Sequence, residues 1–340
     1  MTKKILIRVD ASIEIGAGHF VRQLALAQLL IDEGFDVHFL TKTTQKELIN
    51  QAIEEGVHIQ TLANSITIEA DAQETVAYAK KVSAHWVILD GYSFVTEYQQ
   101  ILKDEGLKLL CVDDMAHCHF VADIVLNQNT TDGRIYSKEP YTQLLMGPEF
   151  ALLRREFRLF ESKKVIRNEI KDIMITMGGS DEKNMTETIL KWLLRLPELK
   201  GVRCHIVLGS LNPHKDSIIA LLSQSNLDGK IYTSLSAKEM LNLMQSVDFA
   251  ITAAGSTVWE YMKIGVPFIY TRLVENQNLS KNFFKKNKIE QLYFDKSSSV
   301  QFEKSLKTFF FHFEDHKERF LQISAKISTS LKFVYEIITK

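Results

Sequence analysis

The sequence predicts an α/β protein built of two doubly wound domains that face a cleft. Short apolar runs of strand length alternate with amphipathic stretches of helical spacing, which is typical of a parallel sheet covered by helices. The same alternation starts again halfway along the chain. The length of 340 residues is sufficient for two domains, each with a core of its own.

The first half contains six runs with the length and composition of strands. They occupy residues 5–9, 36–40, 58–61, 86–89, 107–112 and 124–126. Four stretches between these runs place apolar residues at helical spacing, at residues 20–33, 46–55, 72–83 and 97–105. This order predicts a first domain, residues 1–160, with a parallel sheet and helices on both of its faces.

The second half repeats this alternation after a charged segment at 161–168, which we expect to link the domains. Strands are predicted at residues 170–176, 203–208, 230–232, 249–252, 267–270 and 291–294. The remaining C-terminal residues lack a strand pattern and predict helices, with a buried face formed by Phe309, Phe310, Phe311, Phe313 and Phe320. The second domain is therefore expected to span residues 161–340.

Composition and charge argue against several functional classes. Hydrophobic residues make up 45% and charged residues 24%, the balance of an ordinary globular protein. A net charge of −1 argues against a general surface for nucleic acid or anionic membranes. No apolar run reaches the roughly 18 residues that an integral membrane segment requires. The three cysteines form no pair motif, so we expect a cytoplasmic protein without a disulfide framework. The sequence does not specify an oligomeric state.

The most informative residue is His19, which ends the run Ile-Gly-Ala-Gly-His directly after the first strand. This order places His19 in the first turn of a helix at the carboxyl edge of the sheet, where open α/β sheets bind ligands. The positive end of the helix dipole favours neutral imidazole, the form that a general base requires. Gly16 and Gly18 let main-chain amides approach an oxyanion or a sugar. The alternative is an ordinary tight turn followed by an exposed histidine.

Two further glycine turns, both in the second half, are candidate phosphate sites. Gly178 and Gly179 follow a strand, and Ser180 is placed to cap the next helix while the amides of the turn hold a phosphate. Gly255 and Ser256 follow another strand in the same way. A common loop is the alternative for each turn, but two such turns in one half favour a nucleotide-binding domain.

Three polar side chains near these turns are candidate contacts to a nucleotide or sugar. Glu260 lies one helical turn after Ser256, where an acidic group accepts hydrogen bonds from ribose hydroxyls. The alternative for Glu260 is a solvated charge on the helix surface. Asn276 and Gln277 offer two amides after the strand at 267–270, although amides at such positions are most often helix caps.

Polar residues also follow two strands of the first half, at the sheet edge that carries His19. Asp90 and Tyr92 come after one strand, and Asp113 and Asp114 after the next. They are placed either to hydrogen-bond a sugar or simply to close turns. The run 113–119 contains every type of metal ligand, but its spacing fits no zinc pattern, so we expect no metal there.

Taken together, these motifs resemble one known family. The N-terminal motif reads Arg8-x-Asp10-x-Ser12-x-x-Ile15-Gly16-x-Gly18-His19-x-x-Arg22, and a second motif reads Gly147-x-x-Phe150-Ala151-Leu152-Leu153-Arg154-x-Glu156-Phe157. With the glycine turns, they resemble the UDP-2,4-diacetamido-2,4,6-trideoxy-β-L-altropyranose hydrolases of pseudaminic acid biosynthesis and related spore-coat polysaccharide biosynthesis proteins. The resemblance covers about residues 4–295.

The resemblance implies a glycosyltransferase-B-like fold of two Rossmann-like domains, with a UDP-sugar as substrate and UDP held mainly by the second domain. In that family the histidine matching His19 activates water against the sugar C1, so that UDP leaves and a free amino-sugar is released with inversion. Neither a metal nor a redox cofactor is needed in that scheme. Gly178, Gly179 and Ser256 would approach the diphosphate, and Glu260 the ribose.

The substrate-binding residues expected on these grounds are Asp10, Gly16, Gly18, Arg22, Tyr92, Gly178, Gly179, Ser180, Gly255, Ser256, Glu260, Asn276 and Gln277. Gly91, before Tyr92, departs from the pattern of the family and leaves the identity of the sugar open. Two other functions use the same features. One is a glycosyltransferase in which His19 deprotonates an acceptor hydroxyl, and the other is a nucleotide-sugar-binding scaffold without turnover.

Overall fold

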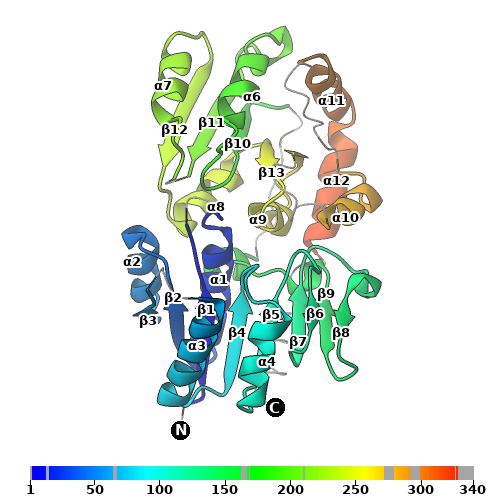
Figure 1. The fold of residues 1–340 in the computed structure, drawn as a ribbon. Helices are drawn as coiled ribbons and strands as arrows, with labels where there is room; N and C mark the ends of the chain where they lie inside the picture. The colour runs from blue at the N-terminus through cyan, green and yellow to red at the C-terminus, as the bar shows by residue number, and fades with distance from the viewer. Residues whose placement is uncertain are drawn as a thin grey trace. The chain divides into compact units, whose positions relative to one another are not determined.

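In the computed structural model, the chain folds as two α/β units. The structure describes residues 2–12, 15–63, 67–161, 167, 169–209, 211–271, 279–289, 291, 299–325 and 327. Unit 1 contains the described residues up to Arg155, and unit 2 contains those from Glu156 to 327. Each unit consists of one main parallel sheet with helices, which confirms the α/β class expected from the sequence (Figure 1).

The sheet of unit 1 has seven strands in the order β3-β2-β1-β4-β5-β7-β9, and all neighbouring pairs are parallel. The strands are β1 (Lys4–Val9), β2 (Asp36–Thr41), β3 (His58–Thr61), β4 (Trp86–Asp90), β5 (Leu109–Val112), β7 (Ile124–Asn127) and β9 (Gln143–Met146). A separate pair is formed by β6 (His119–Phe120) and β8 (Ser137–Lys138).

The helices of unit 1 cover both faces of its sheet because the central strands are apolar on both sides. The helices are α1 (Gly18–Asp32), α2 (Lys46–Glu54), α3 (Ile68–Val82) and α4 (Thr96–Asp104). In β1, Ile5 and Ile7 face a core that includes α1, whereas Leu6 faces a second core that includes α3 and α4. Alternate side chains of a strand point to opposite faces, so one strand supplies both cores.

Unit 2 has a five-stranded sheet in the order β12-β11-β10-β13-β14, again entirely parallel. The strands are β10 (Asp172–Thr176), β11 (Arg203–Leu208), β12 (Asp228–Thr233), β13 (Phe249–Ala253) and β14 (Phe268–Thr271). The helices are α6 (Met185–Leu193), α7 (Lys215–Ser223), α8 (Ala237–Ser246), α9 (Thr257–Ile264), α10 (Ser280–Lys286), α11 (Ser299–Phe311) and α12 (Phe313–Ser324).

Both units place their first strand next to their fourth. In unit 1 the chain runs outward from β1 to β3 and then returns to β4 on the other side of β1. In unit 2, β10 and β13 have the same relation. Such a reversal of strand order creates a crevice at the carboxyl ends of the two strands, which is where open α/β sheets bind ligands.

The sequence missed three strands of unit 1 and misplaced some ends. β6, β8 and β9 were not predicted. The helix expected at 72–83 begins at Ile68, because the hydroxyl of Thr67 accepts a hydrogen bond from the amide of Ala70 and caps an earlier start. Of the strand expected at 291–294, only Gln291 is described, in an isolated parallel bridge with Tyr270. Most of the predicted linker, 161–168, also lies outside the described residues.

The expected aromatic face at the C-terminal end is confirmed with one exception. Phe309, Phe313 and Phe320 are buried in unit 2, and Phe310 packs at the edge of the core. Phe311 is 85% exposed, because it lies on the opposite side of α11 from the buried residues.

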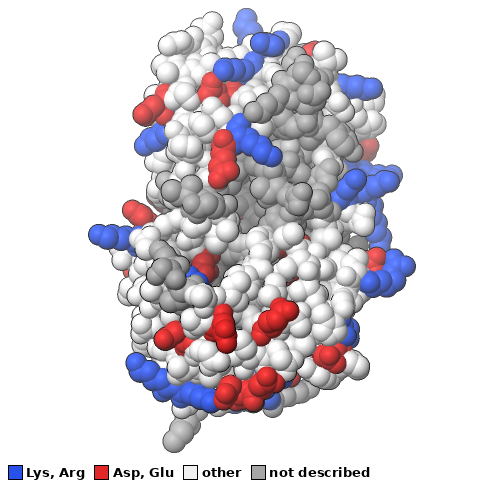
Figure 2. Space-filling model, in the orientation of Figure 1, with Lys and Arg blue, Asp and Glu red and all other residues white. Residues whose placement is uncertain are grey.

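The surface carries both signs of charge. Figure 2 shows Lys and Arg interspersed with Asp and Glu over the face in view, in keeping with the net charge of −1. Within the described part of the chain, every helix is too short or too polar to cross a bilayer.

A buried histidine makes the stability of unit 2 depend on pH. The ring of His316 stacks on Phe309 with centroids 4.3 Å apart, and its Nδ1 accepts a hydrogen bond of 3.2 Å from Nη1 of Arg319. Burial, reinforced by the charge of Arg319, lowers the pKa of His316 to about 4. The folded state therefore favours the neutral ring.

We expect the stability contributed by His316 to be complete above about pH 6.5 and to be lost as the pH falls toward 4, because the unfolded chain binds the proton first. The loss should be on the order of 3 kcal/mol. Amide exchange of α12 as a function of pH measures it. His316→Gln should flatten the dependence, whereas a change at the half-exposed His312 should retain it. If the stability of His316→Gln depends on pH as steeply as that of the natural protein, His316 is not the group responsible for the pH dependence.

Candidate active site

His19 lies at the crevice between β1 and β4, in the position predicted for it. It is the second residue of α1, which follows β1, and it is 5% exposed. The alternative of an exposed histidine is therefore wrong. Its Nδ1 lies 2.6 Å from Oδ1 of Asp90, the last residue of β4. The two residues are 71 positions apart in the sequence, and their contact joins the start of α1 to the end of β4.

The contacts of His19 define which ring nitrogen carries the proton. Arg22 Nη2 also lies 3.0 Å from Nδ1, but Nδ1 cannot accept from Arg22 and donate to Asp90 at once. The shorter contact and the negative charge of Asp90 favour a proton on Nδ1. We therefore assign the Nδ1–H tautomer from the hydrogen-bond network. In this tautomer the lone pair lies on Nε2, which has no hydrogen-bond partner among the described residues.

Asp90 is a buried charge with three partners from α1. Its Oδ2 accepts hydrogen bonds from Nε of Arg22 at 2.6 Å and from Nε2 of Gln23 at 2.7 Å, and Arg22 Nη2 lies 2.5 Å from Oδ1. Burial alone would raise the pKa of Asp90, but the charge of Arg22 and the hydrogen bonds from Arg22 and His19 outweigh it and lower the pKa to about 2. Asp90 therefore remains ionised at neutral pH.

Arg22 forms ion pairs with two buried carboxylates of unit 1. Besides its double contact with Asp90, it donates through Nη1 to Oδ2 of Asp114 at 2.6 Å. The side chain is buried, and its guanidinium joins the ends of β4 and β5. The structure thus gives Arg22 a role that the sequence did not suggest, and direct contact with a substrate stays a prediction.

The ring of Tyr92 packs against His19, and the ring of His117 packs against Tyr92 in turn. The ring of Tyr92 meets that of His19 edge to face, with centroids 4.8 Å apart, and the ring of His117 lies 6.1 Å from Tyr92. Nδ1 of His117 is 3.5 Å from Oδ1 of Asp113, which holds the pKa of His117 above its usual value. Tyr92, expected near a sugar, is therefore placed beside the candidate base.

The glycines before His19 serve the turn in different ways. Gly16 has a φ of +73° and its amide donates to the carbonyl of Ser12 at 2.9 Å, so the backbone itself favours glycine there. Gly18 is the exposed first residue of α1, and a Cβ at this position would meet nothing within 4 Å. Packing does not require glycine at Gly18, and its contact with a ligand stays a prediction.

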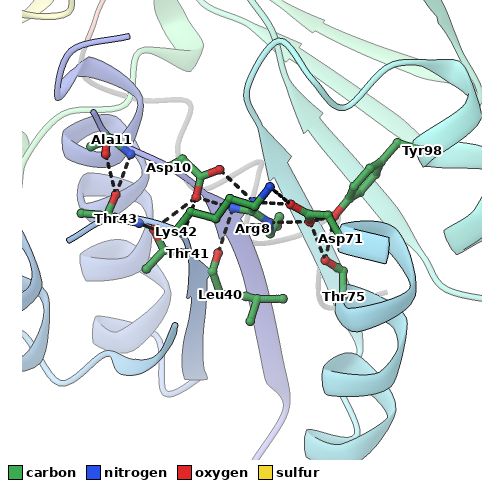
Figure 3. Close-up of polar contacts among 10 residues, drawn as sticks. All are labelled: Arg8, Asp10, Ala11, Leu40, Thr41, Lys42, Thr43, Asp71, Thr75 and Tyr98. Atoms are coloured by element: carbon green, nitrogen blue, oxygen red, sulfur yellow. Dashed lines mark hydrogen bonds and ion pairs between the residues drawn. The ribbon is translucent and has the colours of Figure 1, made fainter. Parts of the chain in front are cut away.

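Asp10 is held by a second buried network under the same sheet edge (Figure 3). Arg8 is fully buried, and it donates to both oxygens of Asp10 and to both oxygens of Asp71 from α3. The amide of Lys42 also donates to Asp10, at 2.6 Å. Both carboxylate oxygens of Asp10 thus have partners inside unit 1, and a substrate would have to share them.

In unit 2, the turn after β10 lies against the end of β11. Gly178 has a φ of +85°, a conformation that favours glycine. A Cβ on Gly209 would lie 2.2 Å from the carbonyl oxygen of Gly179, so the two main chains pack in direct contact. Gly209 was missed by the sequence analysis, because a lone glycine after a strand is an ordinary turn signal.

The capping role expected for Ser180 is wrong. The carboxylate of Asp181 accepts hydrogen bonds from the amides of Met185 and Thr186, at 2.8 and 2.9 Å, and so closes the start of α6. Asp181 reaches these amides because its own φ of +46° turns the chain back toward the helix. Ser180 lies before this turn, half-buried, and its predicted contact with a ligand is not tested by the cap.

The turn after β13 leads directly into α9. Ser256 is the N-cap of α9 but makes no capping hydrogen bond with its side chain, and a Cβ on Gly255 would meet nothing within 4 Å. Glu260 is 6% exposed, so the alternative of a solvated surface charge is wrong. Asn276 and Gln277 lie outside the described residues.

Relatives of known name support the resemblance found in the motifs. A UDP-2,4-diacetamido-2,4,6-trideoxy-β-L-altropyranose hydrolase of Campylobacter jejuni is 28% identical over 299 residues, which cover 85% of this chain and 99% of that protein. The spore coat polysaccharide biosynthesis protein SpsG of Bacillus subtilis is 26% identical over 165 residues, 48% of each chain. An uncharacterised protein of Methanocaldococcus jannaschii is 27% identical over 277 residues. The resemblance is confirmed.

The extent of these matches differs. The chain spans only about half of the Methanocaldococcus and Bacillus proteins, 55% and 48% of their lengths, but nearly all of the Campylobacter protein. No protein-family model matches the chain.

Solved structures establish the fold. MurG of Acinetobacter baumannii has a TM-score of 0.64 at 16% identity, over 99% of both chains. UGT2 of Phytolacca americana has a TM-score of 0.67 at 12% identity, over 100% of this chain and 99% of that one. These likenesses confirm the expected glycosyltransferase-B-like architecture of two Rossmann-like units.

The ion network around Asp90 makes Arg22 critical for the stability of unit 1. We expect Arg22→Met to destabilise unit 1 by roughly 3–5 kcal/mol, since it leaves buried carboxylates without their counter-charge. Arg134→Met is the matched control, because the side chain of Arg134 is 90% exposed and pairs with Asp132 at the surface, where such pairs contribute about 1 kcal/mol or less. Amide exchange of β4 in increasing urea measures both. If both variants lose the same free energy of unfolding, the network around Asp90 does not make a special contribution to the stability of unit 1.

Proposed function

We propose that this chain hydrolyses a UDP-linked deoxyamino sugar at the anomeric C1–O bond and releases UDP and the free sugar. The observation that carries the proposal is the contact of His19 with Asp90. It fixes the ring and its tautomer at a ligand-binding crevice, and it leaves Nε2 to receive a proton. The name of the Campylobacter relative, which the chain matches over 99% of its length, supports the choice of substrate class.

The reaction follows from the chemistry of this dyad. Nε2 of His19 takes a proton from water as the water oxygen bonds to C1. The C1–O bond breaks, its electron pair leaves with the β-phosphate of UDP, and the sugar inverts at C1. Asp90, ionised and buried, stabilises the imidazolium that forms without taking the proton itself. A base positioned in this way contributes about 10²- to 10⁴-fold in rate.

In this proposal, unit 2 binds the nucleotide. The turns at Gly178–Gly179 and at Gly255–Ser256 lie at the second crevice of the same topology, where main-chain amides and the start of α9 favour an anion. Amides that are already oriented stabilise the negative charge of the departing diphosphate without further rearrangement. Glu260, in the first turn of α9, would accept the ribose hydroxyls.

Hydrolysis in ¹⁸O-labelled water tests the reaction and separates it from transfer. With a panel of UDP-deoxyamino sugars and no acceptor, we expect UDP release with ¹⁸O at C1 of an inverted sugar and none in UDP. Label in the nucleotide would mean cleavage at phosphorus. If UDP is released only in the presence of a second sugar or lipid, the protein is the glycosyltransferase of the first alternative. If UDP binds and no sugar is released under either condition, the protein is a nucleotide-sugar-binding scaffold.

His19→Asn should lower kcat by about 10²- to 10⁴-fold, since the base is lost, while the affinity for UDP stays unchanged. Asparagine keeps a donor for Asp90, so the fold is spared. The exposed His85, changed to asparagine, serves as the control and should leave both values unchanged. Near-normal turnover in His19→Asn would remove this residue from the mechanism.

Glu260→Gln should weaken UDP binding by about tenfold, because a charge-assisted hydrogen bond to ribose is worth roughly 1.5–3 kcal/mol. Calorimetric titration with UDP measures the effect. Glu303→Gln on the half-exposed face of α11 is the control, since Glu303 pairs with Lys307 on its own helix. Unchanged UDP affinity in Glu260→Gln would exclude the ribose contact.

A further inference from the structure

Three metal-ligating side chains meet at the amino ends of two strands of unit 1, away from the carboxyl edge that carries His19. Asp36 is the first residue of β2, His38 is the third, and His58 is the first residue of the edge strand β3 (Figure 1). His38 and His58 are register partners in the parallel ladder. Residues two apart on a strand share a face, and so do register partners, so all three side chains point the same way.

The distances suit one small divalent cation. Oδ1 of Asp36 lies 3.5 Å from Nε2 of His38 and 3.1 Å from Nε2 of His58. One ligand atom from each of the three side chains lies within 4.8 Å of the others. A tetrahedral zinc ion with bonds of about 2.0–2.1 Å separates its ligand atoms by about 3.3 Å. His58, with 62% of its side chain exposed, can rotate to close the remaining gap.

His38 provides the second, independent observation. It is 8% exposed, and its Nε2 is buried without a hydrogen-bond partner among the described residues. A buried polar atom left without a partner is costly, and this nitrogen points toward the space shared with Asp36 and His58. On the other side of the ring, Nδ1 lies 3.3 Å from the hydroxyl of Tyr78 on α3. An outer partner of this kind orients the metal-binding nitrogen of a histidine ligand.

The neighbouring charges leave one carboxylate oxygen available. Nζ of Lys4 on β1 lies 3.7 Å from Oδ2 of Asp36, whereas Oδ1 faces the two imidazoles. Nζ of Lys81 lies over the ring of Tyr78, at 5.8 Å from its centroid. A cation at the three ligands would therefore take Oδ1, and Lys4 would keep Oδ2.

We propose that Asp36, His38 and His58 bind one zinc ion, or a related late first-row divalent cation, and that the ion fastens the edge strand β3 to β2. Two imidazoles and one carboxylate favour this class of metal over magnesium or calcium, which prefer oxygen ligands. β3 has four residues, three of them exposed, and lies at the edge of the seven-stranded sheet beside β2. A metal ion bound between the first residue of β3 and β2 would stabilise an edge strand that has little buried surface of its own.

Zinc titration of the full chain, stripped with a chelator, tests the proposal. We expect one equivalent of Zn²⁺ to bind in competition with a chromophoric chelator, and Mg²⁺ not to bind. His58→Asn should weaken zinc binding by more than roughly 100-fold, since even outer partners of a metal site contribute 10- to 100-fold. His58 is exposed, so the variant should fold. His85→Asn, at the start of β4, is the matched control and should bind zinc normally. Absence of binding in the natural chain, or equal binding in His58→Asn, overturns the proposal.

Amide exchange tests the role of the ion. Zinc should slow exchange of the β3 amides in the natural chain and in His85→Asn, and should have no effect in His58→Asn. Zinc that binds without slowing exchange in β3 would overturn the role as a fastener. Nucleotide-sugar hydrolysis should be the same in His58→Asn as in the natural chain, so this proposal and the proposed function stand or fail separately.

Discussion

The structure of the candidate site depends on one buried carboxylate. Asp90 ends a central strand, is 1% exposed, and receives its three side-chain partners from the first turns of α1. A buried charge is tolerated only where it is paired, so α1 cannot shift along the sheet without a large loss of free energy. The same contacts that hold the helix in place orient the imidazole of His19. The position of α1 and the orientation of the candidate base therefore rest on the same interaction.

A second ion network stabilises the neighbouring part of this edge. Arg8 joins Asp10, at the end of β1, to Asp71 on α3, and Tyr98 donates to Asp71 at 2.8 Å (Figure 3). Burial opposes these charges, yet hydrogen bonds from Arg8 bring the pKa of Asp71 down to about 2. Two adjacent networks of buried ion pairs and hydrogen bonds restrain this edge, and a site that positions a base requires such restraint.

What the sequence could and could not predict follows from the range of the interactions. Strands and helices were found because their apolar periodicity is local, and His19 because its glycine turn precedes it directly. The role of Asp90 was not found, since its partner lies 71 residues away and Asp-Gly after a strand is an ordinary turn signal. Asp181 displaced Ser180 as the cap through a backbone angle that no residue pattern shows. The cluster around His38 depends on strand register, which sequence periodicity leaves open.

The two units share a strand order but fill its crevice with different chemistry. In unit 1, His19 is the second residue of α1 and Asp90 is the last residue of β4, and the carboxylate of Asp90 is hydrogen-bonded to the imidazole of His19. In unit 2, the turns after β10 and β13 carry Gly178 and Ser256, and a Cβ on Gly178 would meet nothing within 4 Å. Small residues at a helix start suit an anion, whereas a buried ion pair suits a fixed base. The division between nucleotide binding and proton transfer that we propose would therefore follow from side-chain size and charge at corresponding positions of one topology.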